Sequence, residues 1–468
     1  MMESNARGKK IGLAALCLGL IIWGLTDVRQ RAHFDPALAA QDRAVLMKHR
    51  TDLTVFTEAG AAFFDGRDPY EITNPRGWMY LYPPLFAILI SPLHHLPPQW
   101  QGVAWYFLSL AMAWGCYRET LRLLRLCREA ENHGGVNDRK TLRWIGIGAM
   151  VAVLFPVLDC LQRGQLGILI LYLVLLGLRL VFESESWPGA MAGGVALALS
   201  IVFKVIPILP VFFLLFYLGV RRLKISKNKI HPFRFLGTGT GVMAGLILFL
   251  WLAPSVFIGW QANSGHLNTW SRLVGTRAVE TSVEAHFSTP HSPRNQSLNN
   301  ALYHLGNRVA YGFGRDIEPN PWGFYDTRPR YMSSPSATQA VLAVRVLLVL
   351  LLIPLAWKLA GRAGPLDGLA AAGMACMAML IASPIARGHY FMLEWPAVLF
   401  VSLWVLRNIG PRPALICAGI PAFLSLIHYA LLTWSGPWGV LGIGSALWYA
   451  AMACLLAKTP PLKAESGS

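Results

Sequence analysis

The sequence predicts an all-α polytopic membrane protein, a single domain over residues 1–468 built as a bundle of about twelve transmembrane helices. Three observations lead to this prediction. Hydrophobic residues make up 54% of the chain. Charged residues make up only 14%, against about 25% in an average soluble domain. Apolar runs near the length that crosses a bilayer recur from end to end. The net charge of +17 comes from Lys and Arg clustered between these runs.

The first apolar run, residues 11–27, follows Arg7, Lys9 and Lys10 and in this respect resembles a signal peptide. The small-residue site at 37–39 lies too far beyond the apolar core for ordinary cleavage. We therefore expect an uncleaved first helix. The other runs predicted to span are 100–120, 144–160, 165–182, 188–204, 206–220, 235–254, 337–358, 366–382, 391–407, 413–432 and 437–456.

The basic connections between the runs predict the orientation of the chain. Placing them all in the cytoplasm makes alternate connections face outward, and both termini are then cytoplasmic. Two long connections, residues 28–98 and 255–336, face outward from the inner or plasma membrane. The basic segments are 118–143, 221–229, 358–362, 407–412 and the C-terminal tail.

Residues 82–98 are apolar, but the segment is short and bounded by proline pairs. Counted as a full span, it would turn the basic 118–143 connection outward, against the positive-inside rule. We expect a re-entrant or interfacial helix on the outer face.

Polar residues occur in three turns between predicted spans, and all three turns come to the outward side. Charges at the membrane edge are costly and usually face a cavity or a pathway. Their convergence predicts one polar site at the outer surface. The residues are Asp159, Arg163 and Gln165 in the first turn, Lys204 in the second, and Arg387 with His389 in the third.

The first long connection adds four acids between residues 51 and 70, of which Asp52 is the candidate for this site. Asp65 and Asp68 flank Gly66 and are expected to belong to a turn. Glu58 lies about one and a half helical turns from Asp52 and should face away from it.

Each candidate also has a structural interpretation. Asp52 also fits an ordinary acidic residue of a loop. Lys204 and Arg163 lie at the ends of predicted spans, where cationic side chains commonly extend to the lipid headgroups. His389 beside Tyr390 fits a satisfied interfacial histidine. Asn295-Gln296-Ser297 matches a glycosylation acceptor tripeptide, which is common by chance.

Several short motifs together resemble glycosyltransferase family 87. Asp52-Leu-x-Val-Phe, Ala59-Gly60, Gly66-x-Asp68-Pro69-Tyr70 and Tyr82-Pro83-Pro84 are similar to the family's first outer loop. Gly164-Gln165, Lys204 with Pro207, and His389-Tyr390 resemble later landmarks in the same order. The likeness covers about residues 11–407. Phe56 stands where Tyr is expected, and 255–336 matches no known element.

The resemblance implies a GT-C fold and a membrane glycosyltransferase that uses a polyprenyl-phosphate sugar, similar to mycobacterial phosphatidylinositol mannoside mannosyltransferases. The partners would be the lipid-linked donor, a glycolipid or glycan acceptor, and membrane lipids. The 255–336 connection would cover the acceptor side. No metal or other cofactor is expected. Asp52 would be the general base, Lys204, Arg163, Arg387 and His389 would bind the donor phosphate, and Gln165, Tyr82 and Asp159 would support them.

Two other functions remain open from the sequence. One is a lipid-linked-sugar flippase or transporter, although no internal repeat or midplane polar site accompanies the spans. The other is a non-catalytic component of envelope polysaccharide assembly. No nucleic-acid-binding module accompanies the basic charge. The sequence also has no GxGxxG, P-loop, GxSxG or HExxH motif.

Overall fold

The computed structural model describes residues 15, 18–27, 51–72, 79–129, 139–224, 233–279, 295–298, 301–302, 335–361, 364–383 and 385–458. All named elements of these residues are helices. The predicted first span is described only at 15 and 18–27, where it is helical. The small-residue site at 37–39, the C-terminal tail beyond 458 and most of the second long connection lie outside the described residues.

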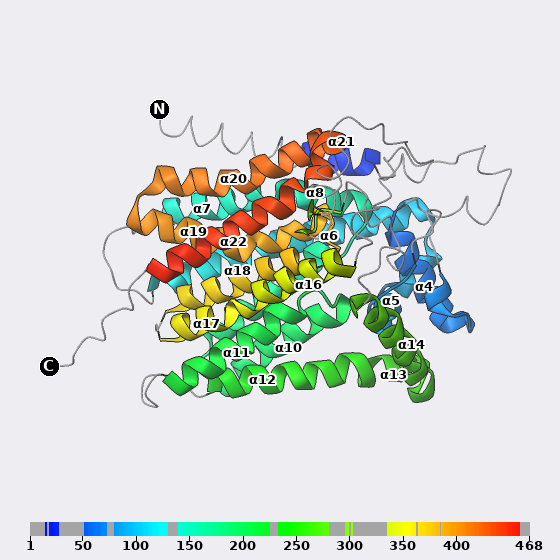
Figure 1. Cartoon of the computed structure of the whole chain (residues 1–468). Helices are drawn as coiled ribbons and strands as arrows, with labels where there is room; N and C mark the ends of the chain where they lie inside the picture. Colours follow the sequence, from blue (N-terminus) through cyan, green and yellow to red (C-terminus); the bar gives the residue numbers. More distant parts are fainter. Residues whose placement is uncertain are drawn as a thin grey trace.

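A bundle of roughly parallel helices forms the body of the protein, and short helices gather at one end of it (Figure 1). The body contains α6 (Pro98–Glu129), α7 (Arg139–Ala152), α8 (Leu154–Arg163), α9 (Gly167–Glu183), α10 (Trp187–Phe203), α11 (Ile208–Lys224), α12 (Phe233–Leu246), α16 (Pro335–Leu350), α17 (Leu352–Ala360), α18 (Pro365–Ala382), α19 (Trp395–Asn408), α20 (Pro411–Ala430) and α22 (Val440–Lys458). The end carries α4 (Leu53–Asp65), α5 (Pro84–Ile90), α13 (Ala253–Ile258) and α14 (Trp260–Val279).

Six helices in the described residues are long and apolar enough to cross a membrane, or seven if the bent α7–α8 pair forms one span. This supports a multi-pass membrane protein. Every predicted run coincides with a described helix at least in part, but α9, α10 and α11 have 17 residues each. At 1.5 Å per residue such a helix is about 25 Å long, somewhat short of the ~30 Å hydrocarbon core. The count of twelve spans therefore stays a prediction.

The axes of α7 and α8 meet at an angle of 52°. The bend falls just before Pro156, which lies in the first turn of α8. Proline has no backbone N–H, and its ring clashes with the carbonyl four residues earlier, so the continuous helix cannot pass through this point. The bend gives α8 its own direction toward the end of the bundle that holds the polar turns.

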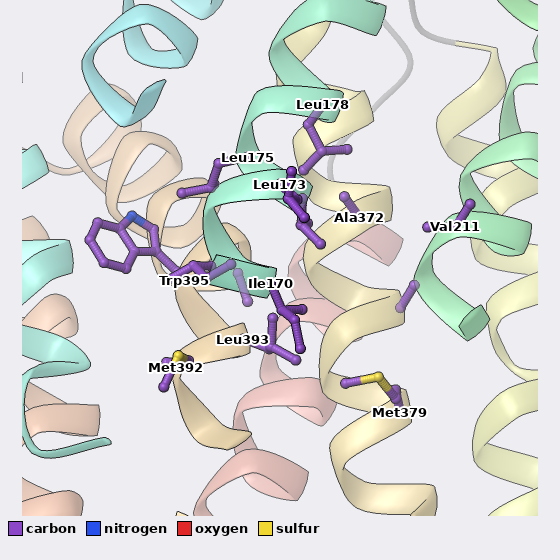
Figure 2. Packing of buried hydrophobic residues seen from close by; sticks show 14 of the residues in the cluster. Ile170, Leu173, Leu175, Leu178, Val211, Ala372, Met379, Met392, Leu393 and Trp395 are labelled. Carbon is purple, nitrogen blue, oxygen red and sulfur yellow. The ribbon is translucent and has the colours of Figure 1, made fainter. Parts of the chain in front are cut away.

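The core forms around α18, whose sequence is almost entirely Ala, Gly, Met and Leu and whose side chains are nearly all buried. Figure 2 shows Ile170, Leu173 and Leu178 of α9 beside Ala372 and Met379 of α18. Lipid-facing helices such as α20 instead expose large apolar side chains, including Ile416. Small residues let helices approach closely where packing, not exclusion of water, holds them together.

The apolar segment 82–98 forms seven residues of α5 and a five-residue 3₁₀ turn, Ser91–His95. These elements extend about 20 Å at the usual rise per residue, too little to cross a ~30 Å hydrocarbon core. Most of α5 is buried against the protein, including Phe86 and Ala87. The length fits the predicted re-entrant or interfacial helix, whose depth in the bilayer stays a prediction.

Candidate active site

The turn between α8 and α9 is the centre of the polar region. Gly164 ends α8 with φ of 65°, a left-handed conformation that favours glycine, and its N–H bonds back to Leu161. A Cβ at Gly164 would lie 2.8 Å from the Cβ of Leu53. The backbone N–H of Asp52 donates to the Arg163 carbonyl at 2.9 Å. The first outer connection is therefore fixed directly on this turn.

Asp52 immediately precedes α4, yet its side chain makes no capping hydrogen bond to that helix. The carboxylate instead accepts a hydrogen bond from Gln165 Nε2 at 2.6 Å, and the residue is only 5% exposed. An aspartate at a helix N-terminus normally caps the backbone. This one is directed into the polar region.

Lys204 lies on the other side of the same glutamine. Its ammonium donates to Gln165 Oε1 at 3.4 Å, and lies 4.3 Å from the ring centre of Tyr390 and 5.4 Å from that of Tyr82. Lys204 is 5% exposed and pairs with no carboxylate among the described residues. A buried ammonium surrounded by neutral groups, two tyrosines and an amide, is well suited to an anionic ligand.

A second polar cluster lies beside the first. Arg163 Nε donates to Asp159 Oδ1 at 2.7 Å, and His389 Nδ1 lies 3.4 Å from Asp159 Oδ2. The His389 ring also packs edge-on against Tyr390, with 4.6 Å between ring centres. Because Arg163 is paired with a carboxylate, its charge is already largely balanced by Asp159.

Arg387 immediately precedes the 3₁₀ turn Gly388–Glu394 that carries His389, and it is buried. Its carbonyl accepts a hydrogen bond from the Tyr390 N–H at 2.8 Å. The structure thus joins Asp52, Gln165, Lys204 and Tyr82 in one contacting set. It joins Asp159, Arg163 and His389 in a second set, and holds Arg387 next to the second set by its backbone.

Tyr82 lies outside the spanning helices, with its ring 5.4 Å from that of Phe56. Burial raises the pKa of Tyr82 to about 12, while the nearby Lys204 ammonium acts in the opposite direction. The phenol is therefore neutral at pH 7 and can donate a hydrogen bond.

The other three acids that the sequence analysis considered lie where it predicts. Glu58 lies 3.7 Å from His94 on another side of α4. Asp65 pairs with exposed Arg67 at 2.8 Å. Asp68 accepts the Tyr70 N–H at 2.9 Å and caps the 3₁₀ turn Pro69–Glu71. Only Asp52 among the four enters the polar region.

Two features of the site are absent from the sequence prediction. Tyr390 contributes the ring nearest to Lys204, a role that its position next to His389 hinted at. Asn295, Gln296 and Ser297 are at most 1% exposed. In the folded protein this tripeptide therefore cannot carry a glycan, which needs an exposed loop.

No group of three or more His, Cys, Asp or Glu side chains arranged to hold a metal occurs among the described residues. The site offers the Asp52 carboxylate, which Gln165 separates from Lys204, and the Asp159 carboxylate beside Arg163. Independence from metal stays a prediction.

The family model of glycosyltransferase family 87 matches residues 80–384, well over half of the chain. Gln165 and Lys204 lie within the matched region, while Asp52, Arg387 and His389 lie outside it. No curated protein matches the chain. With a multi-pass helical fold and a buried polar site at one end of it, the protein belongs to glycosyltransferase family 87 and is a membrane glycosyltransferase.

Proposed function

We propose that the protein transfers a sugar, mannose or another hexose or pentose, from a polyprenyl-phosphate carrier to a lipid or glycan acceptor of the cell envelope. Family membership supports the glycosyltransferase activity, and the buried Lys204 ammonium supports a donor that carries a phosphate. The observation that carries the proposal is the Asp52–Gln165–Lys204 arrangement. One glutamine amide separates a buried carboxylate from a buried cation that has no described carboxylate of its own.

In the proposed reaction Asp52 is the general base. The carboxylate removes the proton from an acceptor hydroxyl as the hydroxyl oxygen attacks the anomeric carbon. The bond between that carbon and the phosphate oxygen breaks, and its electron pair stays on the departing polyprenyl phosphate. A single displacement inverts the anomeric configuration.

Lys204 is proposed as the main contact of the donor phosphate. Its ammonium would stabilise the negative charge that grows on the leaving oxygen. Tyr82 and Gln165 are hydrogen-bond donors beside it. Arg163 is held by Asp159, so we assign it chiefly to fixing the turn on which Asp52 rests, with Arg387 and His389 completing the phosphate site.

We further propose that both termini are cytoplasmic and that the site faces outward, because the basic connections then all lie inside. In a background without native cysteines, Ala130→Cys and Ser292→Cys should react with a membrane-impermeant maleimide from opposite sides of intact cells. Labelling of both positions from outside would contradict this orientation.

The proposed function is tested with purified protein, a radiolabelled polyprenyl-phosphate sugar and a lipid extract of the native envelope. The expected product is a new glycolipid or glycan whose label depends on the protein. A flippase would move the labelled donor across proteoliposomes without forming a glycoside. An assembly component would do neither, so either result would overturn the proposal.

A further inference from the structure

The second outer connection contributes a buried tripeptide, Asn295-Gln296-Ser297, that touches the segment carrying Arg387 and His389. We call residues 295–297 the clamp. Asn295 and Arg387 form an isolated antiparallel bridge. The backbone of Ala386, just before Arg387, bonds to the clamp in both directions. Gln296 N–H donates to the Ala386 carbonyl at 2.7 Å, and Ala386 N–H donates to Asn295 Oδ1 at 3.0 Å.

The clamp is held by a contact within itself and by contacts to residues 436–442. Within it, Asn295 Oδ1 also accepts the Ser297 N–H at 3.2 Å, which fixes the side chain that receives the Ala386 N–H. Gln296 Nε2 donates to the Gly436 carbonyl at 3.0 Å, and Gln296 Oε1 accepts the Leu441 N–H at 3.2 Å. A Cβ at Gly442 would lie 2.2 Å from the Gln296 carbonyl oxygen, so α22 begins directly against the clamp.

These contacts fix the backbone from which three site residues project. The ring of Tyr390 lies 4.3 Å from the Lys204 ammonium, and His389 lies 3.4 Å from Asp159. Both follow Ala386 within four residues, in a turn closed by the Tyr390 N–H bond to the Arg387 carbonyl. We infer that Asn295 and Gln296 are positioning residues for the donor-phosphate site, acting through Arg387, His389 and Tyr390. This inference rests on the proposed function.

The test compares Asn295→Ala and Gln296→Ala with the wild type in two measurements on purified, folded protein. One is equilibrium binding of radiolabelled undecaprenyl phosphate, the product-side lipid. The other is the kcat and donor KM of sugar transfer. We expect a rise of about tenfold or more in the dissociation constant and the donor KM, because small displacements of binding groups have effects of this size or larger. Asn295→Asp should recover most of the affinity, since a carboxylate oxygen can accept both backbone N–H groups.

Asn263→Ala is the matched control. Asn263 is a buried amide of the same outer connection, and its Nδ2 donates to Leu250, Trp251 and Ser255, away from the clamp. This variant should lower the melting temperature without changing lipid affinity. Should Asn295→Ala fail to fold, Gln296→Met takes its place, because it keeps the side-chain volume and the backbone bond to Ala386.

The outcomes separate the two claims. Weakened lipid binding in the clamp variants, unchanged binding in Asn263→Ala and recovery in Asn295→Asp support the inference. Clamp variants that melt earlier but bind undecaprenyl phosphate within about twofold of the wild type overturn it and leave the proposed function intact. If the wild type neither binds the lipid nor transfers sugar, the proposed function falls, and the inference with it.

Discussion

The two ends of α9 carry polar clusters of opposite design. At one end Arg179 donates to both Glu119 and Glu183, and Glu119 also accepts from Arg122 at 2.8 Å. At the other end Gln165, just before α9, separates the Asp52 carboxylate from the Lys204 ammonium. In the first cluster each cationic side chain forms an ion pair with a carboxylate. The second keeps its carboxylate and its cation apart.

This difference distinguishes a structural cluster from a site prepared for chemistry. In the first cluster Glu119 and Arg179 are largely buried, whereas Arg122 and Glu183 are about half exposed. Buried charges in direct contact balance each other, and breaking such a pair leaves an uncompensated charge. A carboxylate and a cation held apart on one rigid amide can each act on a different part of a reacting molecule. The comparison therefore predicts that equal substitutions at the two ends will have different consequences.

The largest effect is expected at Asp52. Asn at this position has nearly the same shape and can still accept the Gln165 hydrogen bond, but it cannot accept a proton at neutral pH. Asp52→Asn should therefore fold and bind the lipid donor while kcat falls by about 10²–10⁴, the usual range for loss of a general base. Initial rates of sugar transfer per folded molecule measure this.

Asp68→Asn is the control for Asp52→Asn within the same connection. Asp68 caps a 3₁₀ turn, so its amide variant should reduce yield but not the activity of each folded molecule. Retention of more than about a tenth of wild-type activity by Asp52→Asn, far above the expected loss, would exclude Asp52 as the base.

The next effect is expected at Lys204. Hydrogen bonds to charged groups contribute about 1.5–3 kcal/mol, so Lys204→Met should lower kcat/KM for the donor roughly tenfold to a hundredfold. Lys204→Arg should recover part of this loss because it restores the charge with a different geometry. A Lys204→Met variant that uses the donor like the wild type would instead fit a lysine that merely extends to the headgroups.

Much of the fold can be predicted from the sequence because apolar runs determine where helices form. The predicted run 366–382 matches α18, Pro365–Ala382, almost residue for residue. The turn assignment of Asp68 is confirmed, because glycine and proline beside an aspartate specify the local backbone. Helix position and turn conformation depend mainly on residues that are close together in the sequence.

The contacts of the site are long-range and were harder to predict. Asp52 and Gln165 are 113 positions apart, and no local pattern predicts that they touch. Asp159 and Arg163 are an exception, because four residues apart on a helix is the spacing of an ion pair. The predicted contact of Arg163 with the donor phosphate stays a prediction, and the ion pair with Asp159 is an additional role. No sequence pattern predicts the role of the clamp, because buried amide side chains do not recur at a regular spacing along the chain.

A smaller effect on function is expected from the same substitution at the opposite end of α9. Arg179→Met removes a cation from between two carboxylates but leaves Arg122 beside Glu119. We expect a loss of about 1–3 kcal/mol in stability, with kcat and donor KM unchanged per folded molecule. Thermal unfolding in detergent and transfer rates measure the two quantities. A donor KM raised as much as in Lys204→Met would remove the distinction between the two ends.

The smallest effect is expected from metal removal. Divalent cations such as Mg²⁺ are bound through carboxylate oxygens, commonly with the phosphate of a substrate. At the polar end of α9, Asp159 is already engaged by Arg163 and lies near His389, and Asp52 accepts from Gln165. The charge that would offset the donor phosphate is Lys204, a side chain of the protein. Activity should therefore stay within about twofold of the untreated enzyme after dialysis against EDTA, because a cationic side chain performs the electrostatic role.

Complete loss with EDTA, reversed by Mg²⁺ or Mn²⁺ but not by Na⁺, would mean that Asp52 or Asp159 binds a metal ion. The contrast between the two ends of α9 would then be one between an ion-paired cluster and a metal site.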